Sequence, residues 1–450
     1  MTAALQLAER ALAAAPPGDA LALARRERSL TYRFARSRPT QATAVDDLGV
    51  EVAVVRDGHV GLTATNDPAP DALAACWSRA DVAATAAARA EGSGSYPGFP
   101  ATAPRTPPAE GDPETARLDP GPGGQAVASA FAAAETAEVE AHGIWTAAEV
   151  ETAVASSAGL SVSEAATDTF MKVICIAPGG RSGYAASTSA AVGGIDAPGL
   201  AETAARKAAT RGDPAVLPED DYPVVLEPHA VGTLLELLAV TAFDGLAHHE
   251  GRGAFAGRLG TQVASPAVNL ADAPRLPATL QRSFDFEGVP KGPLPLIQDG
   301  VAHGVVHDTR SAAMAGAEST GHARVPGGGP GPIPTNLILV GGGAADQAEL
   351  CASIERGVYV TRLWYENVVR PKETLVTAMT RDGTFLIEDG LVTRPLKDMR
   401  LTDSVLGILS RTEALSARPV LTSAGEFYGR RFASGVVCPA IRVGGVPLRP

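Results

Sequence analysis

The strongest hydrophobic pattern of the chain lies between Pro228 and Gly245. Apolar residues recur there at steps of three and four, and they are Val231, Leu234, Leu235, Leu238 and Ala242. This spacing is typical of one face of an α-helix. Proline at the first position and glycine at the last are typical of a helix start and a helix stop. The pattern therefore predicts an amphipathic helix with one buried face.

The N-terminal part of the chain alternates between the helix period and the strand period. Its alanine-rich ends predict helices at Ala3–Ala14 and Asp71–Ala90,. Alternating apolar positions predict strands at Ser29–Arg36, Gly49–Arg56 and His59–Ala64,. The dipeptide Asp57-Gly58 between the last two strands is typical of a two-residue hairpin turn,.

The composition changes at Glu91, where the chain becomes rich in Pro, Gly and Ser as far as Gln125. Such a stretch is typical of a linker or of a long irregular crossing, and it marks a domain boundary. The chain after it predicts two helices and two strands, at Gly124–Ala141, Gly143–Ser156, Leu160–Ala177 and Leu200–Arg211,.

Short strands and turns dominate the rest of the chain. Strands are predicted at Val224–Leu226, Gly288–Ile297, Val301–His307, Asn336–Val340, Val358–Tyr365, Thr384–Glu388 and Leu391–Leu396,. The Pro- and Gly-rich run Val325–Pro334 predicts a flexible loop,. Together these elements predict an α+β fold with an N-terminal α/β segment, a central α+β segment and a β-rich C-terminal domain. The expected boundaries are residues 1–100, 101–215 and 222–450.

Composition excludes several classes of protein. The net charge of -12 argues against a nucleic-acid partner, because phosphate binding needs clustered Lys and Arg,. No stretch approaches the roughly 18 uninterrupted apolar residues of a membrane span. The N-terminus is amphipathic and carries an acidic residue early, so a signal peptide is not expected,. Four cysteines stand far apart, which predicts buried free thiols in a cytoplasmic protein,.

Candidate metal ligands are few. His229 and Glu236 lie seven positions apart on the predicted helix, which separates them by about 10 Å, too far for two ligands of one zinc ion. The densest cluster is His248-His249-Glu250, where adjacent residues point apart. Neither a G-x-S-x-G nucleophile motif nor a Lys-Ser/Thr phosphate loop is present,.

A second group of residues combines polar side chains with tight turns. It includes S-T-G-H at Ser319–His322, P-T-N at Pro334–Asn336, Y-V-T-R at Tyr359–Arg362 and T-R-D-G-T-F at Thr380–Phe385. Arg and amide groups can donate hydrogen bonds to a carboxylate or to a peptide backbone. The same groups can also cap turns and satisfy buried carbonyls, so both interpretations stay open.

These segments carry a family resemblance that extends over nearly the whole chain. It resembles the TldD/PmbA family, in which PmbA is also called TldE. The residues that carry it are Val55–Gly61, Ala254–Ser265, Phe284–Pro290, Pro295–Val301, Ser319–His322, Pro334–Leu337, Ile354–Arg362 and Thr380–Gly390. Their order and spacing together are more specific than any one of them.

The resemblance implies that a zinc motif has been lost. In the TldD branch, an H-E-x-x-x-H helix and a C-terminal Cys supply the zinc ligands, and the Glu acts as general base. Aligned on G-T-L-L, these three positions are Glu236, Leu237 and Thr241. Cys438 lies downstream of the position of the ligand Cys, so that role is not assigned to it. The pattern resembles the PmbA (TldE) branch, which lacks the zinc site.

The resemblance implies a non-catalytic subunit of a TldD/TldE-type peptidase complex. It would hold no cofactor itself and would shape the peptide channel of a zinc-bearing TldD-like partner. The residues expected to line this channel are His322, Asn336, Arg362 and Arg381. Two alternatives are a self-sufficient metallo-hydrolase with a displaced site, using His229, His248, His249 or Glu250, and a homodimeric binding or scaffold protein in a biosynthetic pathway.

Overall fold

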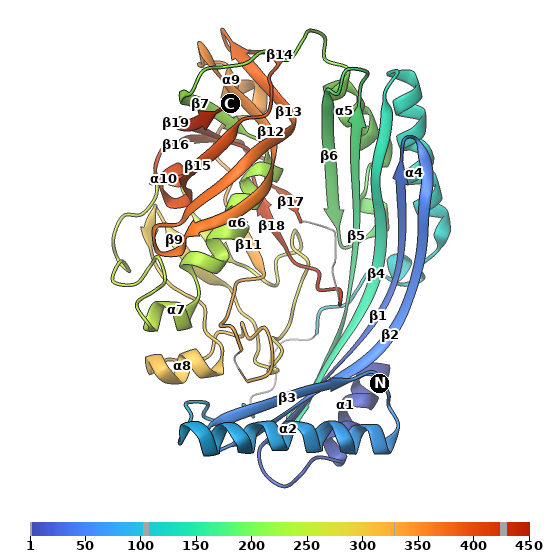
Figure 1. The fold of residues 1–450 in the computed structure, drawn as a ribbon, viewed down its shortest axis with the longest axis vertical. Coiled ribbons are helices and arrows are strands. Elements are labelled where there is room, and N and C mark those ends of the chain that lie inside the picture. Colours follow the sequence, from blue (N-terminus) through green and yellow to red (C-terminus); the bar gives the residue numbers. More distant parts are fainter. Residues whose placement is uncertain (1, 102–107, 328, 424–429) are drawn as a thin grey trace.

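The computed structural model describes residues 2–101, 108–327, 329–423 and 430–450. Its first feature is a sheet of antiparallel strands in the order β3-β2-β1-β4-β5-β6, which runs along the length of the molecule (Figure 1). At about 3.3 Å per residue, a strand as long as β4 reaches about 55 Å. The strands are β1 (Ala20–Ala35), β2 (Arg38–Arg56), β3 (His59–Thr65), β4 (Glu140–Ser156), β5 (Ser161–Ile176) and β6 (Ser182–Ser189).

Strand β1 pairs with both β2 and β4, so the sheet joins the N-terminal segment to the central one. Alternate residues of a strand point to opposite faces. Even-numbered residues of β1, such as Ala22 and Phe34, pack against helices, whereas Leu21 and Leu23 pack with Phe284 of the C-terminal domain. The helices are α1 (Ala3–Ala13) and α2 (Pro70–Glu91) at one end, and α4 (Pro120–Thr136) and α5 (Ala197–Ala208) at the other (Figure 1).

The predicted hairpin is confirmed, since Asp57 and Gly58 both have positive φ values between β2 and β3,. Strand starts were predicted less well. Strand β1 begins at Ala20 and not at Ser29. Its first half was not predicted because it is rich in Ala, Leu and Arg, residues that favour helices. Strand β2 likewise begins at Arg38, and strand β6 was not predicted at all. The predicted helix to Ala141 ends at Thr136, because β4 begins at Glu140.

The first part of the Pro- and Gly-rich stretch, as far as Asp112, is an irregular crossing where the structure describes it, whereas its end contains the short helix α3 (Pro113–Ala116) and the start of α4. Tyr96 donates to the Glu287 carboxylate over 2.9 Å, and the Phe99 backbone N–H donates to Asp19 over 3.0 Å. Residues 102–107 of the predicted linker lie outside the described residues. The described flanks are therefore attached to both the sheet and the C-terminal domain.

Most strands of the C-terminal domain form a sheet that closes on itself. Strand β12 pairs with β7 and β13, and the ring continues through β15 and β19 back to β7. The strands are β7 (Asp220–Leu226), β12 (Arg356–Arg370), β13 (Leu375–Glu388), β14 (Leu391–Pro395), β15 (Arg400–Ser404), β16 (Thr412–Leu415) and β19 (Ile441–Arg449). The short helices α9 (Gln347–Cys351) and α10 (Val405–Ser410) accompany this sheet.

A second, smaller sheet has the order β10-β9-β8-β11-β18-β17. Its strands are β8 (Leu270–Asp272), β9 (Leu294–Gln298), β10 (Val301–Ala302), β11 (Asn336–Leu339), β17 (Val420–Thr422) and β18 (Gly435–Cys438). The two C-terminal strands predicted at 288–297 and 301–307 are therefore much shorter than expected. Around Phe284–Pro290 the backbone N–H groups of Glu287 and Val289 donate to the Asp285 carboxylate, and not to a neighbouring strand.

The predicted amphipathic helix is α6 (Pro228–Ala242), and all five residues of its apolar stripe are buried. Proline occupies a first helical position, as predicted. The predicted stop at Gly245 is wrong, because Asp244 caps the next helix, α7 (Gly245–His249), and α6 ends at Ala242. Gly232 allows α6 to approach β17, since a Cβ atom there would lie 2.2 Å from the Thr422 hydroxyl.

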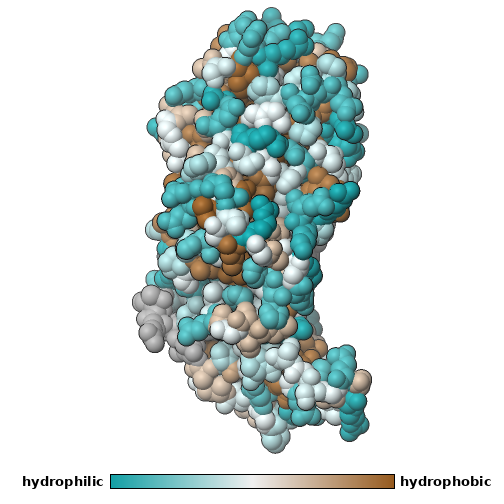
Figure 2. Space-filling model, turned by 90° about the vertical axis from the view of Figure 1, so that its left-hand side faces the viewer, coloured by the Kyte–Doolittle hydropathy of each residue, from teal (hydrophilic) through white to brown (hydrophobic). Residues whose placement is uncertain are grey.

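The predicted α+β class with a β-rich C-terminal domain is confirmed. Between α8 (Thr309–Ala315) and β11, no helix or strand occurs among the described residues, which include most of the predicted loop at Val325–Pro334. All four cysteines are buried and unpaired, as predicted. On the C-terminal side, apolar residues form small groups among hydrophilic ones (Figure 2). In the described part of the chain, no helix is long and apolar enough to cross a membrane.

Candidate functional site

The outer face of α6 forms one wall of a crevice of about 370 Å³. The opposite walls come from β5 and β6 of the central segment, from β12, and from the end of β17. We call it the α6 crevice, and it is lined by Lys172, Tyr184, His229, Gly232, Thr233, Glu236, Arg362, Leu363, Trp364, Glu366, Thr422 and Ser423. It therefore lies where the central segment meets the C-terminal domain.

The start of α6 is fixed by a shared carboxylate. Glu227, the residue before the helix, accepts hydrogen bonds from Lys207 of α5 over 2.6 Å and from Tyr359 of β12 over 2.7 Å. Hydrogen bonds to a charged group are stronger than neutral ones. Glu227 thus holds α6 against the central segment and against β12 at the same time.

Glu236 is the acidic residue of α6 that faces the crevice. Solvent reaches its side chain, but protein atoms crowd the carboxylate on its other sides and withhold water from it. This desolvation, together with repulsion from Glu366, raises the pKa of Glu236 to about 7,. The residue is therefore able to hold a proton near neutral pH.

The other two positions of the lost zinc motif point elsewhere. Leu237 packs against the main hydrophobic core. Thr241 is buried, and its hydroxyl donates to the Leu237 carbonyl over 2.8 Å. Positions five apart on a regular α-helix differ by about 140° in direction, so Glu236 faces the crevice while Thr241 faces the core. The three side chains do not form a zinc ligand set.

Arg362 lies in the crevice with its guanidinium held on three sides. It pairs with Asp382 of β13, and it lies 4.7 Å from the ring centres of both Tyr184 and Trp364. A β-bulge between Trp364 and Asn367 shifts the register of β12 just beyond this point. Bulges of this kind re-aim side chains next to functional sites. Arg362 and Glu236 are thus brought into one crevice from distant parts of the sequence.

Arg381 does not join this crevice. It is the cross-strand partner of Arg362, but its side chain is exposed to solvent. His229 does line the crevice, where its Nε2 atom lies 2.9 Å from the Ala186 carbonyl and its ring packs edge-on against Tyr184. Burial lowers the pKa of His229, so the imidazole is neutral at pH 7,.

Among the described residues, the histidines of α7 do not meet a third metal ligand. His248 is partly buried, His249 is exposed, and the Glu250 carboxylate pairs with Arg252. Across the residues that the structure describes, no three His, Cys, Asp or Glu side chains are grouped closely enough to hold a metal ion. Cys438 is fully buried near the start of α6, where its thiol donates to the Pro228 carbonyl over 3.2 Å.

His322 and Asn336 meet at a residue that the sequence analysis missed. His322 Nε2 lies 2.9 Å from Asp272 Oδ2, and the Asn336 backbone N–H donates to Asp272 Oδ1 over 2.7 Å. Lys291 Nζ lies 3.6 Å from the same carboxylate. These contacts hold the pKa of Asp272 well below its usual range, although burial opposes them,.

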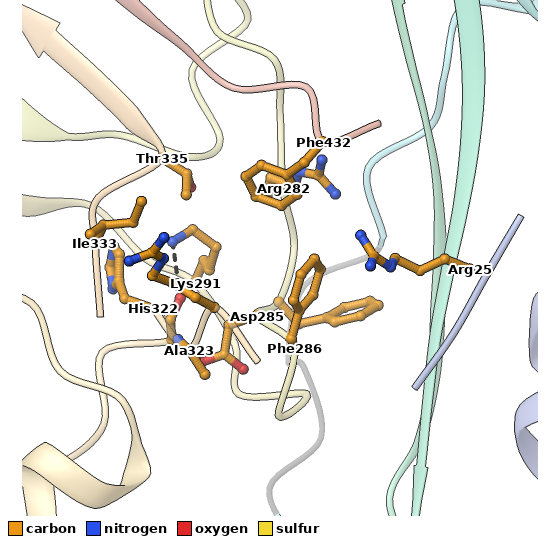
Figure 3. A pocket seen from close by; sticks show the side chains of 13 residues that line it. Arg25, Arg282, Asp285, Phe286, Lys291, His322, Ala323, Ile333, Thr335 and Phe432 are labelled. Atoms are coloured by element: carbon orange, nitrogen blue, oxygen red, sulfur yellow. Dashed lines mark hydrogen bonds between the residues drawn. The ribbon is translucent and has the colours of Figure 1, made fainter. Parts of the chain in front are cut away.

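We call this group the Asp272 cluster. All four of its residues are buried, and they are Asp272, Lys291, His322 and Asn336. The Asn336 side-chain amide donates to the Leu280 carbonyl over 2.6 Å, so it is occupied within the protein. His322 also lines a second hollow, between the C-terminal domain and the long sheet (Figure 3). The four predicted channel residues therefore lie in three places, and their contact with a peptide stays a prediction.

Comparison with known proteins assigns the chain to a family. Residues 219–448 match the family model for the PmbA/TldA metallopeptidase C-terminal domain, residues 124–211 match the central domain, and residues 22–90 match domain 1. The chain belongs to the PmbA/TldD metallopeptidase family. The family resemblance seen in the sequence is thereby confirmed.

Individual members of the PmbA/TldD family show the same relationship. The chain is 26% identical over 275 residues to the metalloprotease TldD homolog of Haemophilus influenzae, covering 59% of this chain and 56% of that protein. It is 24% identical over 200 residues to a metalloprotease of Methanothermobacter thermautotrophicus, covering 44% of each. The chain thus spans about half the length of the curated relatives that it matches.

A solved PmbA/TldD-family structure matches the whole fold. TldE from Thermococcus kodakarensis superposes with a TM-score of 0.85, at 20% sequence identity, over 99% of this chain and 99% of that chain. At this identity the likeness shows the fold alone. The α6 crevice and the Asp272 cluster are therefore interpreted from the residues of this chain.

Proposed function

We propose that this chain is the non-catalytic subunit of a TldD/TldE-type metallopeptidase complex. The observation that carries the proposal is the set of residues at the family's zinc-motif positions. Glu236, Leu237 and Thr241 stand there, and the last two belong to the core of the domain. Neither leucine nor a buried threonine that donates to its own helix can act as a zinc ligand or as a general base.

The proposed partner is a zinc-bearing TldD-like chain with an intact H-E-x-x-x-H helix. In such a complex this chain would shape the peptide channel, and the cytoplasm would be its compartment. Arg362 and Arg381 are the proposed peptide contacts at the α6 crevice and beside it, because arginine donates well to backbone carbonyls and carboxylates. The fold shared with a TldE over the full chain length supports this assignment.

The test is a reconstitution. The purified chain, a TldD-like chain from the same genome, and their mixture are each loaded with zinc, freed of excess metal and assayed on a fluorogenic unstructured peptide. We expect bound zinc in the TldD-like chain and full cleavage only in the mixture. A matched control replaces the motif Glu of the TldD-like chain by Gln, which should abolish cleavage.

Stoichiometric zinc bound by this chain alone, with peptide cleavage by it alone, would refute the proposal. In that case His248→Gln and His249→Gln would show whether the displaced cluster on α7 is responsible. Full activity of the TldD-like chain without this chain would equally contradict a role in shaping the channel.

A further inference from the structure

A second hollow, which we call the Phe286 cavity, lies between β1 of the long sheet and the loops of the C-terminal domain (Figure 3). Its volume is about 300 Å³, at the lower end of small-molecule sites,. It is lined by Arg25, Arg282, Phe284, Asp285, Phe286, Lys291, Gly321, His322, Ala323, Arg324, Ile333, Thr335 and Phe432. This space has the size of one large amino acid.

One wall of the cavity is apolar and rigid. The rings of Phe286 and Phe432 pack edge to face with their centres 5.4 Å apart. A guanidinium group stacks on each ring. That of Arg25 lies 4.9 Å from the centre of the Phe286 ring, and that of Arg282 lies 4.4 Å from the centre of the Phe432 ring. Such stacking fixes the orientation of both partners. Ile333 adds a branched apolar side chain.

The cations of the cavity are unequally neutralised. Arg282 pairs with Glu164 of β5 at 3.6 Å, and Lys291 pairs with Asp272 at 3.6 Å. Arg25 pairs with Glu51, to which its Nη2 atom donates over 2.8 Å. Its Nε atom has no acceptor in the described part of the chain, but it is buried and out of reach of a ligand. This leaves Nη1 as the donor that Arg25 can offer to a ligand.

Arg324 adds a charge without a counter-ion. Its side chain is exposed, and it makes no hydrogen bond or ion pair with any residue that the structure describes. The Asp285 carboxylate, in contrast, is occupied, because it accepts backbone N–H groups from Glu287, Val289 and Ala323 over 2.8 to 2.9 Å. The lining thus offers one uncompensated positive charge beside an aromatic wall.

We propose that the Phe286 cavity binds an α-carboxylate that carries an adjacent aromatic or branched apolar side chain. Arg324 and the Nη1 atom of Arg25 receive the carboxylate, because planar guanidinium groups match its geometry. Phe286, Phe432 and Ile333 receive the side chain. A dianion such as phosphate fits less well, because three of the four cations already pair with carboxylates and Asp285 repels a second negative charge,.

This ligand chemistry has two sources, a free N-acylated amino acid and the C-terminus of a peptide. The peptide source rests on the proposed function, whereas the site itself rests only on the lining residues. Binding is therefore measured on the chain alone, without zinc, partner or cleavage, so that its outcome is independent of the reconstitution. The probes for isothermal titration are N-acetyl-L-phenylalanine, its amide, and the tripeptide acid N-acetyl-Ala-Ala-Phe.

We expect the acid to bind at least about tenfold more tightly than the amide, because the charge-assisted hydrogen bond is lost. Arg324→Gln should weaken binding of the acid by about tenfold and leave the affinity for the amide unchanged. Arg258→Gln removes another exposed arginine that has no partner among the described residues, and it should leave both affinities unchanged. Tighter binding of the tripeptide acid than of N-acetyl-L-phenylalanine would identify a peptide C-terminus, and the reverse a free acylated amino acid.

Equal affinities for acid and amide would overturn the proposal, and so would unchanged binding in Arg324→Gln. Displacement of the acid by equimolar inorganic phosphate would show that the site is a general anion site, which also contradicts it. Ile333→Asp provides a second variant at the apolar wall. Ile333 is only half-buried, so the fold should tolerate the change, and the added carboxylate should abolish binding of the acid,.

Discussion

The Asp272 cluster makes a stability prediction whose size can be worked out from its geometry. Lys291 Nζ lies 3.6 Å from Asp272 Oδ2, and the two side chains are 3% and 0% exposed. At an effective dielectric constant of 20, two unit charges at this distance attract by about 5 kcal/mol. Lys291→Met keeps the aliphatic stem and removes the charge, so Asp272 retains only neutral donors.

We expect Lys291→Met to lower the free energy of unfolding by about 3–5 kcal/mol, the usual cost of breaking a buried ion pair. Urea unfolding at pH 7, followed by circular dichroism, measures this loss. Lys397→Met is the matched control, because Lys397 is exposed and its amine has no partner among the described residues. It should change the free energy of unfolding by less than about 0.5 kcal/mol.

The same change in an Asp272→Asn background separates the ion pair from packing. If the charge on Asp272 is the reason for the loss, Lys291→Met should cost much less once that charge is absent. An equal loss in both backgrounds would refute the reasoning. A loss below about 1 kcal/mol in the wild-type background would show that water or rearrangement compensates the carboxylate.

Further predictions concern other buried groups. Burial lowers the pKa of His322 to about 4, so as the pH falls the unfolded chain binds the proton before the folded chain does. The free energy of unfolding of the wild type should therefore fall by about 3 kcal/mol more than that of His322→Gln between pH 6.5 and pH 4. Parallel profiles of unfolding free energy against pH would contradict this. The raised pKa of Glu236 means that the folded chain binds the proton more tightly, so stability falls as the pH rises from about 4.3 to about 7,. Glu236→Gln should therefore raise the melting temperature more at pH 8 than at pH 4, and an equal change at both values would argue against it. Thr241→Val should leave peptidase activity of the reconstituted complex intact, since it removes one intrahelical hydrogen bond. Leu238→Ala, on the buried stripe, should lower the free energy of unfolding in urea by about 2–5 kcal/mol,. A smaller loss would mean that the core fills the space left by the leucine side chain.

The elements that the sequence predicts well are those whose pattern is local. The stripe on α6, from Val231 to Ala242, recurs over about three turns,, and the turn at Asp57-Gly58 is encoded by two residues. Strand β1 was predicted only in part because its alanines favour helices, and its extended form depends on pairing with β2 and β4,. The strand predicted at Gly288–Ile297 begins only at Leu294, because the hydrogen bonding on both sides of Gly288 is decided by the side chain of Asp285.

The candidate sites depend on contacts between distant residues, which one sequence does not reveal. His322 and Asn336 were singled out from their motifs, but Asp272, which joins them, lies 50 and 64 positions away. Its only local signal is a carboxylate at the end of a short apolar strand. The Phe286 cavity likewise combines Arg25 of β1 with loops more than 250 residues later in the chain.

The long strands of the N-terminal sheet have a consequence for dividing the chain. A cut near residue 100 would separate β1 from β4, which pair over 14 residues from Leu21 to Phe34. Both pieces would then expose a long unpaired strand edge, which is a template for aggregation. We expect the two pieces to be insoluble when made singly and to reassemble when coexpressed. The residues before and after this point should thus act as complementing fragments, because β1 and β4 pair although they lie far apart in the sequence.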